Sequence, residues 1–192
     1  MNDMVNCLIE FLEVGIHEFM YFYPQIFYVC KKYDVPVHAC RHPLLHEYIH
    51  DMLDTCRVLI AQGRVEKLSV GIFASTGELL DTCVFEIGLN AGVLKRTLEE
   101  SFRKALVQLC SASSLVVNPP GEPYQKSFRL FLDTIEESIA PETLVNEQTT
   151  ANSWVLTEEP SSGVLYPIAS NEASMPIHFN IYLIRPINPS GI

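Results

Sequence analysis

Basic residues are scarce in this sequence. Its 192 residues include 13 lysines and arginines against 23 aspartates and glutamates, which gives a formal net charge of −10. A surface this acidic repels a phosphate backbone unless basic residues gather in one place. The basic run Lys31-Lys32 is too short to form such a patch. We therefore expect no direct binding of nucleic acid and expect protein partners instead, with basic partners favoured by the charge.

The sequence also lacks C-x-x-C pairs and long hydrophobic runs. Its six cysteines lie at positions 7, 30, 40, 56, 83 and 110. Acidic residues at positions 3, 10 and 13 interrupt the apolar N-terminal region, and no basic segment precedes it. This pattern predicts neither a signal peptide nor a transmembrane span. A reduced intracellular compartment without membrane contact is the simplest interpretation, and these features leave nucleus and cytoplasm open.

Sequence motifs that are typical of catalytic sites are missing as well. The sequence contains no Gly-rich phosphate loop, no G-x-S-x-G elbow and no carboxylate pair with an obvious partner. We therefore predict a binding protein rather than an enzyme, with no catalytic residues and no cofactor.

What the sequence does contain is the pattern of a globular α+β domain. Hydrophobic residues make up 48% of the chain and charged residues 19%, which argues against disorder. Apolar spacings of three and four predict helices over residues 5–23, 43–62 and 94–109. Alternating apolar residues predict strands over residues 65–74, 79–87 and 126–133, and the first two should form a hairpin.

The last third of the chain has a different character. From about residue 135 the helical period fades, and five of the twelve prolines fall in the last 33 residues. Three apolar islands with strand character remain, namely SWVL, GVLYPI and IHFNIYLI. A long irregular segment of this kind inside one domain is more often functional than idle.

The segment HACRHPLLHEYIHD, residues 38–51, is the strongest candidate for metal chemistry. Its HEYIH matches the zinc-protease pattern H-E-x-x-H, in which two histidines hold zinc and the glutamate is the general base. The continuation H-x-x-G-x-x-H is absent after His50, and the later glutamates Glu66 and Glu78 fall in the predicted hairpin. We therefore predict no functional metal site and place these histidines on the polar edge of an amphipathic helix.

Two alternatives stay open for this segment. One is a small metalloprotease that uses His46, Glu47 and His50. The other is adventitious zinc or nickel binding by His42, His46 and His50, which would not define the function.

A series of motifs in one order gives the chain a family resemblance. It includes FLEVGIHEFMY, YPQIF, KKYDVPV, HPLLHEYIHD, VEKLSVGIF, VFEI, NPPG, SWVL and LYPI. Over about residues 7 to 185 this series resembles the HORMA-domain family, and within it the mitotic-arrest-deficient-like accessory subunits of DNA polymerase zeta. The resemblance implies one HORMA domain over residues 1–192, with three helices packed on an antiparallel sheet. Residues 1–134 would form its core, and about 135–192 a "safety belt" that wraps over a partner peptide laid against the sheet edge.

The resemblance also implies which residues bind. Tyr48 matches an aromatic residue that meets the peptide, and Trp154 and Leu156 match belt residues that close on its proline-containing part. A second face, with Leu165, Asn180 and Tyr182, is implied to receive the C-terminal domain of a scaffold translesion polymerase. Asn180 is shorter than the glutamine usual in the family, which weakens this expectation.

The implied function is that of a non-catalytic adaptor. It would capture a peptide of the catalytic subunit of polymerase zeta and bridge it to the scaffold polymerase in the nucleus, in DNA damage tolerance and repair, with a cytoplasmic pool left open. Arg103 matches an arginine at a HORMA–HORMA dimer contact, and the family also works with a remodelling ATPase. The alternative within the same fold is a spindle-checkpoint protein that binds cell-cycle regulator peptides.

Overall fold

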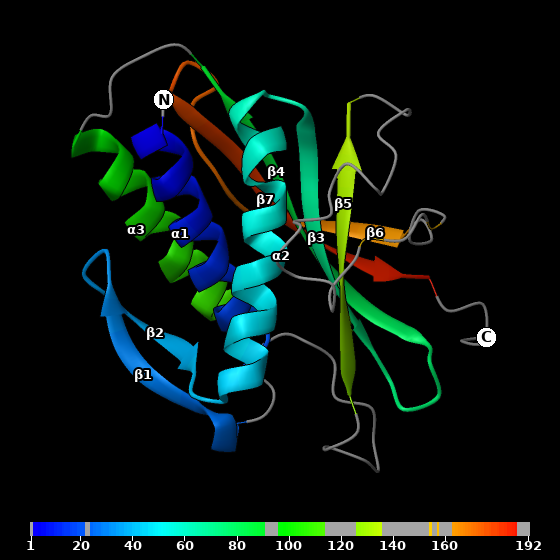
Figure 1. The fold of residues 1–192 in the computed structure, drawn as a ribbon. Coiled ribbons are helices and arrows are strands. Elements are labelled where there is room, and N and C mark those ends of the chain that lie inside the picture. The colour runs from blue at the N-terminus through cyan, green and yellow to red at the C-terminus, as the bar shows by residue number, and fades with distance from the viewer. Residues whose placement is uncertain are drawn as a thin grey trace.

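The computed structural model describes residues 2–21, 24–90, 96–113, 126–135, 154, 157 and 163–187. These residues form three α-helices, one short 3₁₀ turn and seven strands (Figure 1). The helices are α1 (Asn2–Phe19), α2 (Pro43–Ala61) and α3 (Arg96–Ser113), and the 3₁₀ turn is η1 (Pro24–Ile26). The strands are β1 (Phe27–Lys32), β2 (Val35–Cys40), β3 (Val65–Phe73), β4 (Leu79–Leu89), β5 (Ser127–Thr134), β6 (Gly163–Ser170) and β7 (Ile177–Pro186). No described helix is long and apolar enough to cross a membrane.

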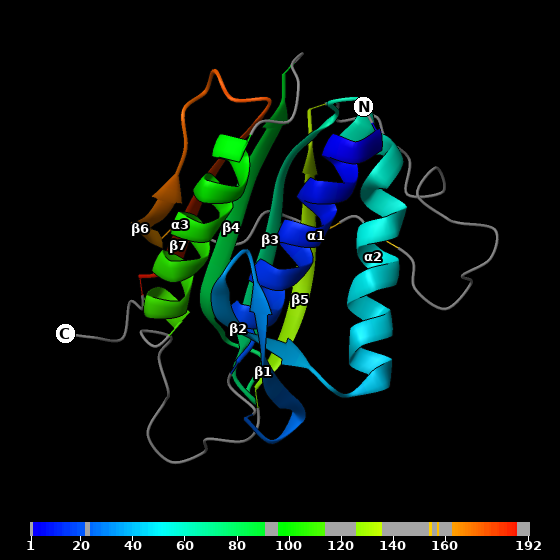
Figure 2. The same ribbon diagram turned by 90° about the vertical axis from the view of Figure 1, so that its left-hand side faces the viewer.

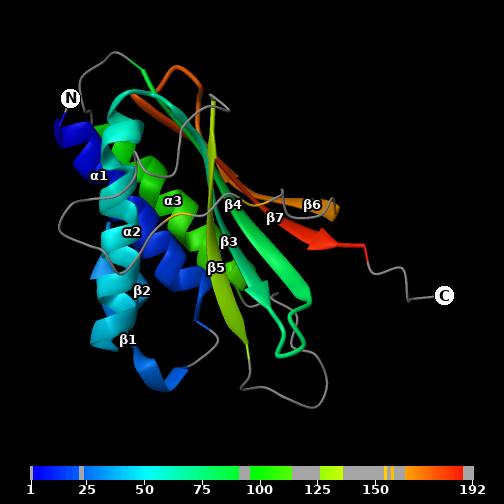
Figure 3. The ribbon, with the colours of Figure 1, turned by 45° about the vertical axis from the view of Figure 1, so that its right-hand side comes forward.

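Five strands form one antiparallel sheet in the order β5-β3-β4-β7-β6. The helices cover one face of this sheet, and no helix of the described residues lies on the other face (Figure 3). The predicted hairpin of β3 and β4 is confirmed, and Gly77 in its turn has a φ of +84°, which glycine adopts without strain. The α+β fold expected from the sequence is therefore the fold observed.

Helix α1 lies between the other two helices and is buried on most of its surface. The ring of Phe11 stacks on Phe102 of α3, with 4.2 Å between centroids, and lies 5.2 Å from Phe179 of β7. The helix ends at Phe19, earlier than the predicted end at residue 23, because the backbone turns at Met20. Tyr21 then leaves the helix direction and stacks on His38 at 3.5 Å.

Helix α2 matches its predicted bounds closely. Pro43 opens its first turn, where a missing backbone N–H costs nothing. Gln62 caps the other end, and Gly63 follows with a φ of +67°.

The sequence did not predict the hairpin of β1 and β2. Strands β1 and β2 nevertheless pair along their whole length in a separate two-stranded sheet. Figure 2 shows this hairpin across α1 from the main sheet. Tyr33 and Asp34 form its turn with positive φ angles of 47° and 61°.

The C-terminal region supplies two of the five strands of the main sheet. The predicted strand character of GVLYPI and IHFNIYLI is confirmed by β6 and β7, which pair antiparallel. Strand β7 also pairs with β4, so this region completes the sheet. Of the island SWVL, only Trp154 lies within the described residues, and it is not in a strand.

Candidate functional site

The first candidate surface lies where α2 approaches the edge strand β5. Tyr48 of α2 meets Phe128 of β5 edge-to-face, with 5.8 Å between ring centroids and 70° between planes. Phe128 pairs with Ile72 of β3 in register and therefore points to the helix-covered face of the sheet. Burial raises the pKa of the Tyr48 hydroxyl above its ordinary value. Tyr48 is thus a half-buried aromatic beside the sheet edge.

Trp154 is held on the same helix. Its indole N–H donates a hydrogen bond of 2.9 Å to the Thr55 hydroxyl, which donates in turn to the Met52 carbonyl at 2.7 Å. Thr55 follows Tyr48 by seven residues, about two helical turns, so both face the same side of α2. The Trp154 ring is partly buried against the core.

Trp154 belongs to the segment that connects the two edge strands of the main sheet. Strands β5 and β6 lie at opposite edges of the sheet, so the chain between Thr134 and Gly163 has to travel from one edge to the other. Trp154 marks one point of that path, on α2. Within the described residues β5 pairs with β3 alone, so its outer edge presents backbone groups that a further strand could use. Leu156 lies outside the described residues.

The second predicted surface lies on the sheet face away from the helices. Asn180 and the Tyr182 hydroxyl both donate to the Glu86 carboxylate, at 2.9 and 2.8 Å. Leu165 pairs with Ile184, two residues beyond Tyr182, so its side chain is on the same face. Burial and the bond to Glu86 raise the pKa of Tyr182.

The exposure of these residues is unequal. Leu165 is 54% exposed, whereas Tyr182 is only 7% exposed. The structure thus brings the three predicted residues onto one face, with Leu165 and Asn180 outermost.

Arg103 has a role within its own chain. From α3, its Nε donates to the Tyr33 carbonyl at 2.9 Å, and its guanidinium lies 3.0 Å from the Asp34 carboxylate. These bonds tie α3 to the turn between β1 and β2. The side chain remains 46% exposed.

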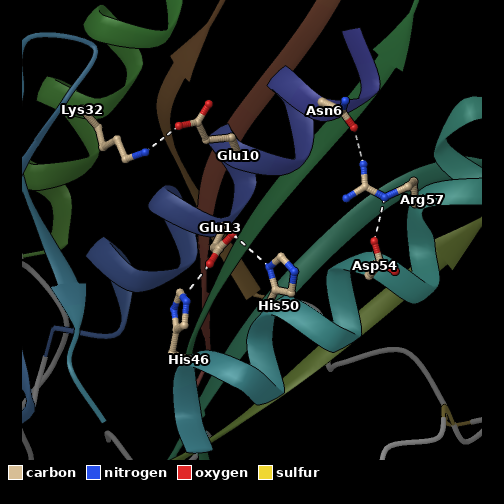
Figure 4. Close-up of polar contacts among 8 residues, drawn as sticks. All are labelled: Asn6, Glu10, Glu13, Lys32, His46, His50, Asp54 and Arg57. Carbon is tan, nitrogen blue, oxygen red and sulfur yellow. Dashed lines mark hydrogen bonds and ion pairs between the residues drawn. The ribbon is translucent and has the colours of Figure 1, made fainter. Parts of the chain in front are cut away.

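The histidines of HEYIH lie on the border expected from the helix pattern, but they face a partner on α1. The side chains of His46 and His50 are 55% and 54% exposed, and both Nδ1 atoms lie near the Glu13 carboxylate, at 3.5 and 3.6 Å (Figure 4). Glu47, which the metalloprotease alternative needs at the metal, is not part of this cluster in the described chain. His42 caps the start of α2 and is not part of it either.

Comparisons with known proteins agree with this architecture. No protein-family model matches the chain. It is 33% identical over 129 residues to the human mitotic spindle assembly checkpoint protein MAD2B, an alignment that covers 62% of this chain and 61% of that protein. It is 28% identical over 196 residues to the DNA polymerase zeta processivity subunit of Arabidopsis thaliana, covering 96% of this chain and 87% of that subunit.

Solved structures give the fold. One chain of the mitotic checkpoint complex superposes with a TM-score of 0.76 at 15% identity, covering 96% of this chain and 99% of that chain. C. elegans HTP-2 bound to the HIM-3 closure motif superposes with a TM-score of 0.68 at 10% identity, covering 96% and 90%. The chain has the HORMA fold and is related in sequence to MAD2B.

Several residues of this HORMA protein's candidate surfaces were not predicted from the sequence. Phe128 and Thr55 contact Tyr48 and Trp154, and Glu86 accepts both bonds of the second face. Each carried a weak signal at most, because an alternating aromatic in a strand or a threonine in a helix usually serves the core. Their roles depend on tertiary packing, which places β5 beside α2 and β4 beside β7.

Proposed function

We propose that this HORMA protein is a non-catalytic adaptor subunit of translesion DNA polymerase zeta. It captures a proline-containing peptide of the catalytic subunit between α2, the edge of β5 and a safety belt over residues 135–192. The observation that carries this proposal is the hydrogen bond that holds Trp154 on α2, on the same side as Tyr48. Tyr48 in turn contacts Phe128 of β5, which within the described residues pairs on one edge alone. The name of the Arabidopsis relative, a polymerase zeta processivity subunit, supports the choice of partner.

The physics of such a site suits slow release. A peptide added to the outer edge of β5 would gain backbone hydrogen bonds, each worth about 1 kcal/mol net. Trp154, with Leu156 two residues on, would close over the peptide, and an indole ring offers a large flat surface for proline. Release would then require the belt to lift from α2, which makes dissociation slow compared with a peptide on an open edge.

Isothermal titration with a proline-containing peptide of the catalytic subunit tests this site. The double variant Tyr48→Ala, Trp154→Ala should weaken binding at least tenfold, because two aromatic contacts are lost. Tyr28→Ala is a matched control, since Tyr28 is an exposed tyrosine on β1. Unchanged affinity in the double variant, with the control also unchanged, would contradict the belt assignment.

The bridging role is assigned to the second surface. We propose that Leu165, Asn180 and Tyr182 receive the C-terminal domain of a scaffold translesion polymerase, with Leu165 as the exposed apolar contact. Leu165→Ala should weaken this contact by roughly tenfold and leave peptide capture unchanged. Val164→Ala is the control, because Val164 is similarly exposed but points to the opposite face of β6. Equal losses of affinity in both variants would contradict the assignment of this surface to the scaffold polymerase.

One alternative to the polymerase zeta function is also supported by the comparisons. The relatives named for the mitotic spindle assembly checkpoint favour a second candidate function, the capture of cell-cycle regulator peptides. The same candidate site at α2 and β5 would serve both functions, so a pull-down that compares the two peptide classes separates them. A nuclear location, an Arg103 dimer contact and a remodelling ATPase that opens the belt belong to the first proposal. Preferential capture of checkpoint peptides would move the protein to the second.

A further inference from the structure

Three histidines and a glutamate from two helices meet at the interface of α1 and α2. Figure 4 shows the Glu13 carboxylate of α1 between the rings of His46 and His50 of α2. His17 lies one turn after Glu13 on α1, and its ring centroid is 5.7 Å from that of His46. One ligand atom from each of Glu13, His17 and His46 falls within 4.8 Å of the others. This cluster is outside the candidate peptide site.

His17 is the most informative member of the cluster. It is 4% exposed, and its Nε2 has no hydrogen-bond partner within the described part of the chain. Leaving a buried polar nitrogen without a partner is energetically costly, so such an atom needs an explanation, and a bound ion is one. Burial, followed by the nearby His46, lowers the pKa of His17 to about 4.

The spacing of the cluster is close to that of a zinc site. With Zn–N and Zn–O bonds near 2.0–2.1 Å, tetrahedral ligand atoms lie about 3.3 Å apart. His46 Nδ1 and Glu13 Oε1 are 3.5 Å apart, and the largest separation in the three-residue group is within 4.8 Å. Small side-chain rotations would bring all three atoms to bonding distance of one ion.

We propose that Glu13, His17 and His46 bind one divalent transition-metal ion, with Zn²⁺ as the natural occupant of this nitrogen and oxygen donor set. His50 contacts the other Glu13 oxygen and orients the carboxylate, as outer-shell partners of metal ligands do. Water completes the coordination from the exposed side of His46. The ligand set differs from the adventitious one considered for the sequence, because it gains Glu13 and His17 and omits His42.

Such a site would clamp α1 to α2. Glu13 and His17 are one turn apart on one helix, and His46 and His50 are one turn apart on the other, so one ion fixes the register of the pair. Helix α2 also carries Tyr48 and Thr55. The clamp therefore stabilises the element that presents the candidate peptide site, and it does so whether or not a peptide is captured there.

Zinc titration of the full-length chain, without a histidine tag and freed of metal by EDTA, tests the proposal. Calorimetry should show one Zn²⁺ per chain, and Co²⁺ should give the visible absorption of a tetrahedral site. Glu13→Gln and His46→Gln should each weaken Zn²⁺ binding at least tenfold, because loss of a single outer-shell partner already costs roughly 10–100-fold. Zn²⁺ at 100 times its Kd should raise the Tm by roughly 5–10 °C in the unaltered protein.

His42→Gln is the matched control, because it removes an exposed histidine one turn before His46. It should leave the Zn²⁺ affinity unchanged within twofold. Equal weakening by His42→Gln and His46→Gln would show adventitious binding by surface histidines and overturn the proposal, as would the absence of saturable binding. Both altered ligands are partly exposed, so these variants are expected to fold. Circular dichroism without metal verifies this, and His50→Gln replaces any variant that is unfolded.

Discussion

A single hydrogen bond joins Trp154 to α2, from its indole N–H to the Thr55 hydroxyl. The bond sets the position of the chain's one tryptophan within a segment rich in polar residues. Thr55 itself bonds back to Met52, so its hydroxyl is oriented by the helix before Trp154 arrives. In the proposed mechanism, a side chain seven residues from Tyr48 would thereby fix where the safety belt meets the helix.

Thr55→Val removes the acceptor and keeps the shape of the side chain. A hydrogen bond is worth about 0.5–1.5 kcal/mol net, so the dissociation rate of a captured peptide should rise roughly threefold to tenfold. Biolayer interferometry measures this rate. Thr55→Ser keeps the hydroxyl and should dissociate as the unaltered protein does. Faster peptide dissociation from Thr55→Ser, or an unchanged dissociation rate from Thr55→Val, would argue against a belt held through Trp154.

At the scale of elements, α1 packs closely against the sheet at Gly15. A Cβ atom there would lie 2.9 Å from Cε1 of Phe85 in β4 and 3.5 Å from Leu109 of α3. Phe85 is fully buried, so its ring has no room to retreat. The lack of a side chain at Gly15 thus sets the distance between the central helix and the sheet.

Gly15→Ala is expected to lower the free energy of unfolding by about 1 kcal/mol. Alanine gains about 1 kcal/mol of helix propensity, while overpacking of a buried ring costs roughly 1–3 kcal/mol. In a Phe85→Leu background the overlap is relieved, and the same substitution should stabilise by up to about 1 kcal/mol. Urea unfolding of all four proteins measures the coupling. Equal effects of Gly15→Ala in both backgrounds would contradict a close contact at this position.

The elements most accurately predicted from the sequence are those with local signals. Pro43 and Gly63 mark the ends of α2, and the alternation around Gly77 marks the hairpin of β3 and β4. The hairpin of β1 and β2 was missed because its turn uses Tyr33 and Asp34 in a backbone conformation for which glycine is the usual signal. Local chemistry was sufficient where turn residues were typical and failed where they were not.

Contacts between elements that are distant in the sequence could not be predicted and were found only in the structure. The E-x-x-x-H spacing of Glu13 and His17 was visible in the sequence, but nothing local indicated that it would face the H-x-x-x-H of α2. The adjacency of Tyr48 and Phe128, 80 positions apart, likewise follows from sheet order. The role of Tyr48 came from family resemblance, and it stays a prediction until peptide binding is measured.

At the scale of the whole molecule, the net charge of −10 and the path of the chain would act on different steps of the proposed peptide capture. Long-range attraction raises the rate of encounter with a basic peptide, and salt screens it. In the proposed mechanism, the connection from β5 to β6, which contacts α2 at Trp154, would affect escape instead, because a captured peptide would leave only after Trp154 lifts from α2. Association and dissociation should therefore respond differently to ionic strength.

For a closure peptide that carries lysines or arginines, the association rate should fall roughly threefold to tenfold between 50 and 500 mM NaCl. The dissociation rate should change less than twofold, since apolar and backbone contacts hold the peptide. Stopped-flow fluorescence of Trp154 measures both rates. A peptide with glutamines in place of its basic residues is the control and should associate at a rate nearly independent of salt. If both peptides lose association equally, the charge of the protein does not steer capture; if dissociation accelerates strongly with salt, ion pairs rather than the belt retain the peptide.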